Sequence, residues 1–242
     1  MMMENGVRRK LAKEVADFYE SEGPAFSSKR TQPWNLMGLL TDRLKSGDLL
    51  VDIGAGNCRL ADVIPNDVRY LGVEPSSSLR KEADQFLLSR NNGEVITGSL
   101  PKLDLQDRCA DAIACIAVLH HIPSREMRAE SITELHRILK PGGLMLLTVW
   151  NPRALRFLSW NTFKNAWLRL RGVKGGEPGD LYYPWKASGK LEERYVHAFT
   201  LSEFKSLFDP ALWSIEKIGA YDKESWCSWV KGRNLVALVM KK

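Results

Sequence analysis

The sequence contains 242 residues, of which 44% are hydrophobic and 26% charged, a composition typical of a soluble α/β protein. This length suffices for one domain with a substantial core, and a formal net charge of +6 permits an anionic partner without requiring one. No apolar run approaches the roughly 20 residues of a membrane-spanning helix, which excludes an integral membrane protein of that type.

The cysteines and the N-terminus indicate a compartment. The four cysteines form neither a C-x-x-C pair nor a cysteine–histidine cluster with zinc spacing, so we expect reduced thiols and no metal site. The first residues lack the apolar segment of a signal peptide. We therefore expect a cytoplasmic protein without a membrane partner.

The first predicted element is an amphipathic helix over residues 7–20. One face of this helix carries four apolar side chains, at Val7, Leu11, Val15 and Phe18. We expect it to precede the sheet and to pack across the ligand-binding mouth. The polar segment FSSKRTQPW, residues 26–34, then leads into a second helix at about 34–45, for which Pro33 is a suitable start. Residues 1–46 are thus expected to form a helical extension.

Residues 49–59, LLVDIGAGNCR, combine a buried strand with a glycine turn. The run up to Asp52 is continuously apolar, as in a fully buried parallel strand. Gly54 and Gly56 allow the backbone to turn sharply and to approach a ligand closely. A second strand, residues 69–74, ends in Glu74, whose carboxylate is placed to bind ribose hydroxyls at the carboxyl edge of the sheet.

The spacing within this turn separates two classes of ligand. A dinucleotide fold requires G-x-G-x-x-G, but Arg59 stands where the third glycine is needed. The pattern D-x-G-x-G instead resembles the first motif of class I S-adenosylmethionine methyltransferases, and a carboxylate there suits a ligand with an ammonium group and no phosphate. Cys58 departs from this motif, which often has a third glycine at that position. We predict that S-adenosylmethionine is bound by Asp52, Gly54, Gly56 and Glu74.

Further candidates follow the third and fourth strands. A strand at residues 95–97 precedes Ser99 and Leu100, which fall where methyltransferases bring a loop beneath the adenine, although many of them carry an aspartate at the position of Ser99. A strand at residues 111–117 precedes His120 and His121, at the edge where open α/β sheets bind ligands. The two histidines are interpreted as a general base, a substrate hydrogen-bonder or a packing element. With no third ligand near in sequence, a metal site is not favoured there.

The remaining elements define the fold class. Ser76 and Ser124 are predicted to cap helices, and Lys140-Pro141-Gly142-Gly143 ends the second of them. A strand at 144–150, a helix near 201–208 and strands at about 213–219 and 234–240 follow. This alternation predicts an α/β fold with a doubly wound, Rossmann-like, seven-stranded methyltransferase sheet, mostly parallel with an antiparallel C-terminal edge strand, in a single domain over residues 1–242.

An insertion at about residues 151–195 interrupts this alternation. From Asn151 to Lys174 it is basic and aromatic and contains no acidic residue. Cations interleaved with tryptophans suit RNA, because phosphates bind Lys and Arg and unstacked bases stack on aromatic rings, although a solvated helix face shows the same pattern. We expect this insertion to lie over the ligand mouth on the substrate side.

Four segments together resemble one family: FSSKRTQPW at 26–34, DIGAGN at 52–57, IAVLHHIPSREMR at 116–128 and RYVHAFTLSEF at 194–204. These are the tRNA wobble-uridine methyltransferases that esterify 5-carboxymethyluridine, which occur alone or fused to a hydroxylase of the AlkB type. The resemblance implies S-adenosylmethionine as cofactor, tRNA as substrate and, as for many members, a small zinc-binding activator subunit as partner. It implies a substrate site that contains Arg30, His120 or His121, Arg194, Tyr195 and His197, to which we add Trp34.

The nature of the methyl acceptor decides which chemistry is needed. A carboxylate acceptor is already ionised at neutral pH, since such groups titrate near about 4, and Arg30 with Arg194 would hold it without a strong general base. A hydroxyl or amine acceptor would instead require His120 or His121 to take a proton. The alternatives are a methyltransferase for a small-molecule acid or other metabolite, a non-catalytic module that binds S-adenosylmethionine or RNA, and for Arg30 a merely solvated charge.

Overall fold

The structure is a computed structural model that describes residues 5–28, 35–90, 93–152, 154, 176–186 and 191–242. Its strands are β1 (Leu49–Ile53), β2 (Arg69–Val73), β3 (Gly93–Ile96), β4 (Ala110–Ile116), β5 (Leu139–Trp150), β6 (Asp180–Lys186), β7 (Leu191–His197), β8 (Trp213–Asp222), β9 (Ser225–Cys227) and β10 (Asn234–Lys241). Its helices are α1 (Asn5–Ser28), α2 (Gly38–Thr41), α3 (Ser77–Leu87), α4 (Arg125–Ile138) and α6 (Leu201–Lys205), with the 3₁₀ helices η1 (Asn35–Met37), η2 (Arg59–Val63) and η3 (Leu119–His121).

The predicted fold class is confirmed by the strand order β3-β2-β1-β4-β5-β10-β8-β9 of the large sheet. The strands from β3 to β5 in this order pair in parallel, and β10 lies antiparallel between β5 and β8. The sheet has eight strands rather than seven, because the short strand β9 folds back antiparallel on β8. The strands β6 and β7 form a separate antiparallel pair.

Core packing explains why the sheet is buried on both faces. In β1, Val51 and Ile53 belong to a core cluster that includes the inward side of α4, whereas Leu50 belongs to a second cluster that includes η1, α2 and α3. Successive strand residues point to opposite faces, so a continuous apolar run supplies both clusters. This arrangement is the physical reason for the run in the sequence.

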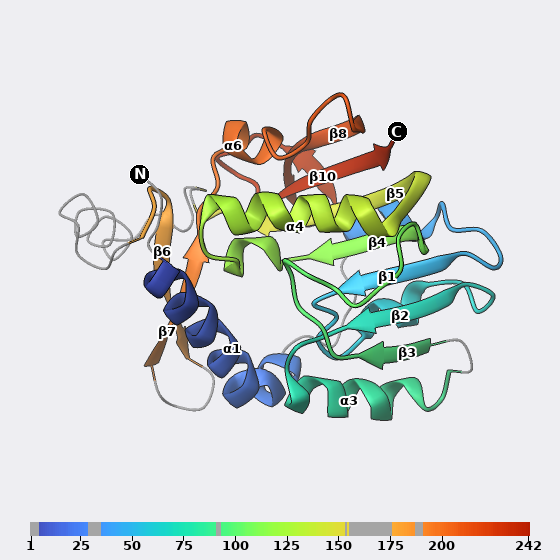
Figure 1. Cartoon of the computed structure of the whole chain (residues 1–242), viewed down its shortest axis with the longest axis horizontal. Helices are drawn as coiled ribbons and strands as arrows, with labels where there is room; N and C mark the ends of the chain where they lie inside the picture. The colour runs from blue at the N-terminus through green and yellow to red at the C-terminus, as the bar shows by residue number, and fades with distance from the viewer. Residues whose placement is uncertain (1–4, 29–34, 91–92, 153, 155–175, 187–190) are drawn as a thin grey trace.

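The helix α1 occupies the position that the sequence predicted. It lies beside the ends toward which the arrows of β1 to β4 point (Figure 1), and it packs against α3 and β7. It is longer than expected, since it spans Asn5–Ser28. Gly23 permits its close approach to α3, because a Cβ there would lie 2.9 Å from a side-chain carbon of Leu79.

Several boundaries differ from the prediction. The second helix is short, with η1 and α2 ending at Thr41. The strand β5 already begins at Leu139 and so includes Lys140-Pro141-Gly142-Gly143, the stretch expected to end a helix. The β6–β7 hairpin was not predicted, and Pro184 within β6 is tolerated because, among the described strands, this pair has no further neighbour. Within the described part of the chain, every helix is too short or too polar to traverse a lipid bilayer.

Candidate functional site

The glycine turn after β1 forms the base of the site. Gly54 and Gly56 have φ values of +66° and +58°, in the left-handed region that other residues rarely adopt. A Cβ on Gly54 would also lie 2.4 Å from Cγ2 of Val118, whereas one on Gly56 would meet nothing within 4 Å. Gly54 is therefore constrained by both conformation and space, and Gly56 by conformation alone.

Glu74 is tied to this turn by backbone donors. The amide of Gly56 donates to Glu74 Oε2 and that of Ser76 donates to Oε1, each at 2.9 Å. Only 4% of Glu74 is exposed, and burial raises the pKa of this carboxyl group even though both amides favour its charged form. The carboxylate at the end of β2 thus has a fixed orientation toward the glycine turn.

Asp52 is the second buried carboxyl group of the turn. Burial raises its pKa to about 7, while the Tyr70 hydroxyl, which donates to Asp52 Oδ2 at 2.7 Å, opposes this increase. Arg59 also favours the charged form. A cationic ligand would therefore stabilise an ionised Asp52 that burial alone disfavours.

The departure at Cys58 is accommodated within the fold. Cys58 is fully buried and has φ +59°, the left-handed conformation that a glycine would adopt more easily. Its sulfur occupies the space left by Gly72, where a Cβ would lie 2.8 Å from Cys58 Sγ. Burial raises the pKa of the Cys58 thiol to about 12, so this group stays protonated and unreactive at neutral pH.

A cavity of about 450 Å³ opens above the turn, at the carboxyl ends of the parallel strands. Six of the predicted site residues line it: Gly54, Gly56, Glu74, Ser99, Leu100 and His121. One face of α1 forms one wall, through residues that include the exposed Asp17 and Glu20 and the half-buried Tyr19. Asp52 instead lines a smaller cavity, of about 60 Å³, that shares Gly54 and Gly56 with the large one.

Glu20 fixes α1 to the rim of this cavity. Its carboxylate accepts hydrogen bonds from the Ser76 hydroxyl at 2.9 Å and from the Ser77 amide at 2.8 Å, at the N-terminus of α3. These hydrogen bonds, with that of the Ser77 hydroxyl, lower the pKa of Glu20. A negative charge at a helix N-terminus is favourable, so this contact stabilises the wall where it meets Glu74.

The two histidines of η3 have different environments. His121 lines the cavity, with Nε2 2.8 Å from the Tyr19 hydroxyl and Nδ1 3.0 Å from the carbonyl oxygen of Tyr195. His120 is fully buried behind it, accepts the Trp150 amide at Nδ1 over 3.3 Å and stacks on the Trp150 ring. The geometry gives His121 access to the cavity and gives His120 a packing position.

Arg194 lies next to this pair in a buried aromatic environment. Its guanidinium lies 4.4 Å from the centroid of the Trp150 ring and is only 1% exposed. It donates from Nη1 to the Tyr19 hydroxyl over 2.9 Å. Arg194 therefore places a positive charge behind Tyr19, at the end of the cavity that His121 lines.

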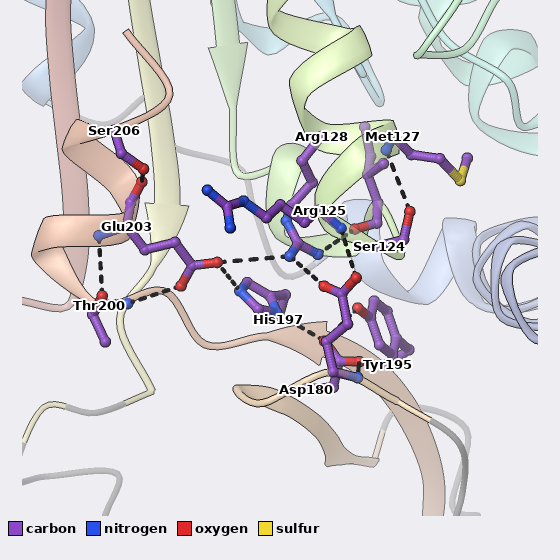
Figure 2. A network of polar contacts seen from close by, with 12 residues as sticks. Ser124, Arg125, Met127, Arg128, Asp180, Tyr195, His197, Thr200, Glu203 and Ser206 are labelled. Atoms are coloured by element: carbon purple, nitrogen blue, oxygen red, sulfur yellow. Dashed lines mark hydrogen bonds and ion pairs between the residues drawn. The ribbon is translucent and has the colours of Figure 1, made fainter. Parts of the chain in front are cut away.

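Tyr195 and His197 belong to a different, buried polar network (Figure 2). The Tyr195 hydroxyl donates to Asp180 Oδ1 over 2.7 Å. His197 lies between two carboxylates, with Nδ1 2.7 Å from Asp180 and Nε2 2.7 Å from Glu203. Arg128 completes the network, 2.9 Å from Glu177 and 3.6 Å from Glu203. The network joins the β6–β7 hairpin to α4 and α6.

The electrostatics of this network indicate ion pairs. Burial would raise the pKa values of Asp180 and Glu203, but the hydrogen bonds and charge of His197 lower both. Donor atoms of Glu177, Asp180 and His197 also lie within 4.8 Å of one another, a spacing that a metal ion could use. Both His197 nitrogens face carboxylates, so the observed contacts are those of a cationic imidazolium.

The structure thus brings some predicted residues together and separates others. In the described part of the chain, the side chains of Tyr195 and His197 support the hairpin and are not among those lining the cavity. Arg30, Trp34 and the basic stretch at 155–175 lie outside the described residues. Sequence reasoning missed Tyr19, Glu20, Tyr70, Trp150 and Asp180, whose roles arise from contacts between distant segments. Only the amphipathic pattern of α1 offered a signal, because it indicated which helix would cover the mouth.

A known family described as a methyltransferase domain matches residues 51–147. The chain is 33% identical over 138 residues to the tRNA (carboxymethyluridine(34)-5-O)-methyltransferase of Arabidopsis thaliana. The aligned region covers 57% of this chain and 33% of the relative. It is 28% identical to the Schizosaccharomyces pombe protein of the same name, over 89% of this chain and 94% of that one. The chain therefore spans about a third of the length of the first relative and nearly all of the second.

Solved structures agree on the fold. A Burkholderia thailandensis 1,6-didemethyltoxoflavin-N1-methyltransferase with bound S-adenosylhomocysteine superposes with a TM-score of 0.68 at 15% identity, over 97% of this chain and 90% of that one. The putative methyltransferase in complex with the Trm112 methyltransferase activator of Haloferax volcanii gives a TM-score of 0.63 at 15% identity, over 93% of this chain and 96% of that one. Residues 51–147 thus match a methyltransferase domain, the fold agrees with that of solved methyltransferases, and the chain resembles the tRNA carboxymethyluridine methyltransferases in sequence.

Proposed function

We propose that this protein transfers a methyl group from S-adenosylmethionine to the carboxylate of 5-carboxymethyluridine at the wobble position of tRNA. The observation that carries the proposal is the cationic end of the cavity, where Arg194, Tyr19 and His121 are joined by hydrogen bonds. A buried positive charge at that place suits an anionic acceptor. The names of the Arabidopsis and fission yeast relatives support tRNA as the molecule that carries it.

The residues of the glycine turn fit the cofactor. Gly54 leaves open a position that a Cβ could not occupy, and Glu74 is held where ribose hydroxyls are bound in folds of this type. Asp52 suits the ammonium group, while Ser99 and Leu100 border the cavity where the adenine would lie. When bound, S-adenosylmethionine supplies a methyl group on a positively charged sulfur.

Alignment is the main task left to the protein. Methyl transfer to a carboxylate oxygen is an in-line displacement, the acceptor is already ionised at neutral pH, and no proton has to be removed from it. The chain's own residues then need to hold the acceptor and exclude water. His121 and Tyr19 line the acceptor end of the cavity, and Arg194 supplies charge behind them.

Other parts of the proposal rest on the resemblance. We assign Arg30 to the carboxylate, together with Trp34 as a neighbouring contact, and the basic segment within 151–195 to the tRNA backbone. The Tyr195–His197 network would hold the hairpin that carries Arg194. A small zinc-binding activator is the proposed partner, and the Trm112 complex of the Haloferax neighbour supports this choice. We further propose one domain over residues 1–242 and, since tRNA is its substrate, a cytoplasmic location.

The decisive experiment supplies methyl-labelled S-adenosylmethionine and tRNA from cells that lack wobble methyl esters. We expect label in the tRNA, release of the label by mild alkali, and identification of the ester by nucleoside analysis. Addition of a Trm112-type subunit tests the activator in the same assay. Alkali-stable label would overturn the ester.

Two outcomes would favour the alternatives. Methylation of small organic acids without tRNA would identify a small-molecule enzyme, and binding of tRNA would then lack a steep salt dependence. Cofactor binding with no transfer to any acceptor would identify a non-catalytic module. The Arg30→Ala variant sharpens the test, because we expect lost turnover on tRNA with S-adenosylhomocysteine still bound.

A further inference from the structure

The hydrogen bonds around Tyr19 have fixed directions. The carbonyl oxygen of Tyr195 can only accept, so the Nδ1 atom of His121 carries a hydrogen. In a neutral imidazole the Nε2 atom is then an acceptor, and it receives the Tyr19 hydroxyl. Arg194 can only donate, so Nη1 donates to the Tyr19 oxygen. The hydrogen bonds therefore all point in one direction, from Arg194 through Tyr19 to His121.

Tyr19 is also the link between the buried charge and the cavity. Its half-buried ring lines the cavity, as does His121, whereas Arg194 is 1% exposed and stacks on Trp150. Arg194 is not among the described residues that line the cavity. Its positive charge therefore influences the cavity through its hydrogen bond to the Tyr19 oxygen. A hydroxyl that accepts from a cation is a stronger donor.

We propose that Tyr19 is an acceptor-binding residue whose hydroxyl turns from His121 to the carboxylate of the substrate when His121 takes up a proton. The protonated Nε2 then donates to the Tyr19 oxygen, which still accepts from Arg194, and the Tyr19 hydrogen is directed into the cavity. The proton comes from solvent, and no covalent bond of Tyr19 breaks. This inference rests on the proposed carboxylate acceptor.

The surroundings of His121 are consistent with this change. Among the described residues, His121 contacts Tyr19 from α1, His120 from η3, Trp150 from β5 and the Tyr195 carbonyl from β7, and Arg194 lies on the other side of the Tyr19 hydroxyl. Asp17, Glu20 and Glu74 line the same cavity and add negative charge. An anionic acceptor favours a cationic imidazolium, and the neutral ester product no longer does, which favours product release.

The test compares Tyr19→Phe with Tyr182→Phe. The first variant keeps the ring and removes the hydroxyl at the cavity, and the second removes a hydroxyl from β6, whose ring contacts Tyr195. We expect kcat/KM for carboxymethyluridine tRNA to fall about 10-fold to 100-fold in Tyr19→Phe, mainly through KM, with S-adenosylhomocysteine affinity unchanged. Tyr182→Phe should remain within about twofold of the parent, since the half-buried Tyr182 is not among the described residues that line the cavity.

The pH profile separates binding from a merely structural role. In the parent, KM for tRNA should rise with pH as His121 loses its proton, and this rise should be absent from Tyr19→Phe. A parent enzyme that forms no alkali-labile product overturns the proposed function and this inference with it. Ester formation by the parent with equal KM and equal pH dependence in Tyr19→Phe overturns this inference alone.

Discussion

The half of the cavity that we propose binds the cofactor (the cofactor half) and the half that we propose binds the acceptor (the acceptor half) are built in different ways. The cofactor half consists of the turn after β1 and the end of β2, and Asp52 and Glu74 each lie 18 positions from their hydrogen-bond partners, Tyr70 and Gly56. The acceptor half combines α1, η3 and β7, and its hydrogen bonds join Tyr19 to His121 and Arg194, which are 102 and 175 positions away.

This difference concerns how each half is stabilised. Backbone conformation and short links fix the cofactor half, whereas the acceptor half depends on the docking of α1 and on the network around His197. Changes in the first half should therefore affect cofactor binding directly. Changes in the second half should affect stability and the use of tRNA while cofactor binding persists.

The largest effect is expected from Gly54→Ala. The new Cβ would lie 2.4 Å from Val118 Cγ2 and would force a non-glycine residue to φ +66°. We expect S-adenosylhomocysteine affinity, measured by calorimetry, to fall by about 100-fold or more, since clash and strain each cost about 1–3 kcal/mol. Gly56→Ala is the matched control because it adds strain without a clash. Equal losses in both variants would contradict the role of space at Gly54.

The next effect is expected from His197→Gln, in the buried network that supports the acceptor half. Gln cannot carry the charge that His197 places between Asp180 and Glu203, so the free energy of unfolding should fall by about 3 kcal/mol. Cofactor affinity should be unchanged, and kcat/KM for tRNA should fall. Glu193→Gln, exposed on the same strand, serves as the control.

The same network sets a pH dependence for this variant. The pKa values of Asp180 and Glu203 are lowered in the fold, so the stability they contribute is present above the ordinary carboxyl range and is lost as the pH falls through their lowered values. Chemical unfolding should be measured between about pH 3 and 7. The difference in the free energy of unfolding between the parent and His197→Gln should become smaller as the pH falls. A constant difference would argue against a charged network.

A smaller effect concerns Asp52 in the cofactor half. Its pKa is raised from 3.8 to about 7, so the folded protein retains a proton that the unfolded chain releases, and the free energy of unfolding falls as the pH rises through this window. Binding of an ammonium-bearing ligand needs the charged form, so S-adenosylhomocysteine affinity should rise about 10-fold from about pH 6 to 8. Asp52→Asn should bind weakly at every pH, and an identical rise in that variant would exclude Asp52.

The smallest effect is expected from Cys58→Ala. Loss of the sulfur beside Gly72 should lower the free energy of unfolding by about 1 kcal/mol, because a small buried cavity remains. Cys58→Gly should be closer to the parent, since it also relieves the left-handed conformation. Thermal unfolding with and without S-adenosylhomocysteine measures both. A large loss of cofactor affinity would show that Cys58 shapes the site itself.

The sequence by itself determined the fold class and the glycine turn of the proposed cofactor half. Buried parallel strands appear as continuous apolar runs, and Gly54, Gly56 and Glu74 depend on turn geometry that a few neighbouring residues encode. It also placed α1 across the mouth, from the amphipathic pattern of that helix. The extra strand β9 was not predicted because it has only three residues. The β6–β7 hairpin was not predicted because Pro184 lies within β6 and weakens the sequence pattern of a strand.

Only the tertiary structure decided which side chains meet in the acceptor half. His120 and His121 are adjacent and identical in type, and their separation into a packing and a cavity position follows from the partners Trp150 and Tyr19. Arg194, Tyr195 and His197 similarly divide, because Arg194 donates to Tyr19 at the cavity while the side chains of Tyr195 and His197 belong to the buried network. Local sequence encodes backbone conformation, but the partner of a polar side chain is fixed by the packing of elements that are far apart in the chain.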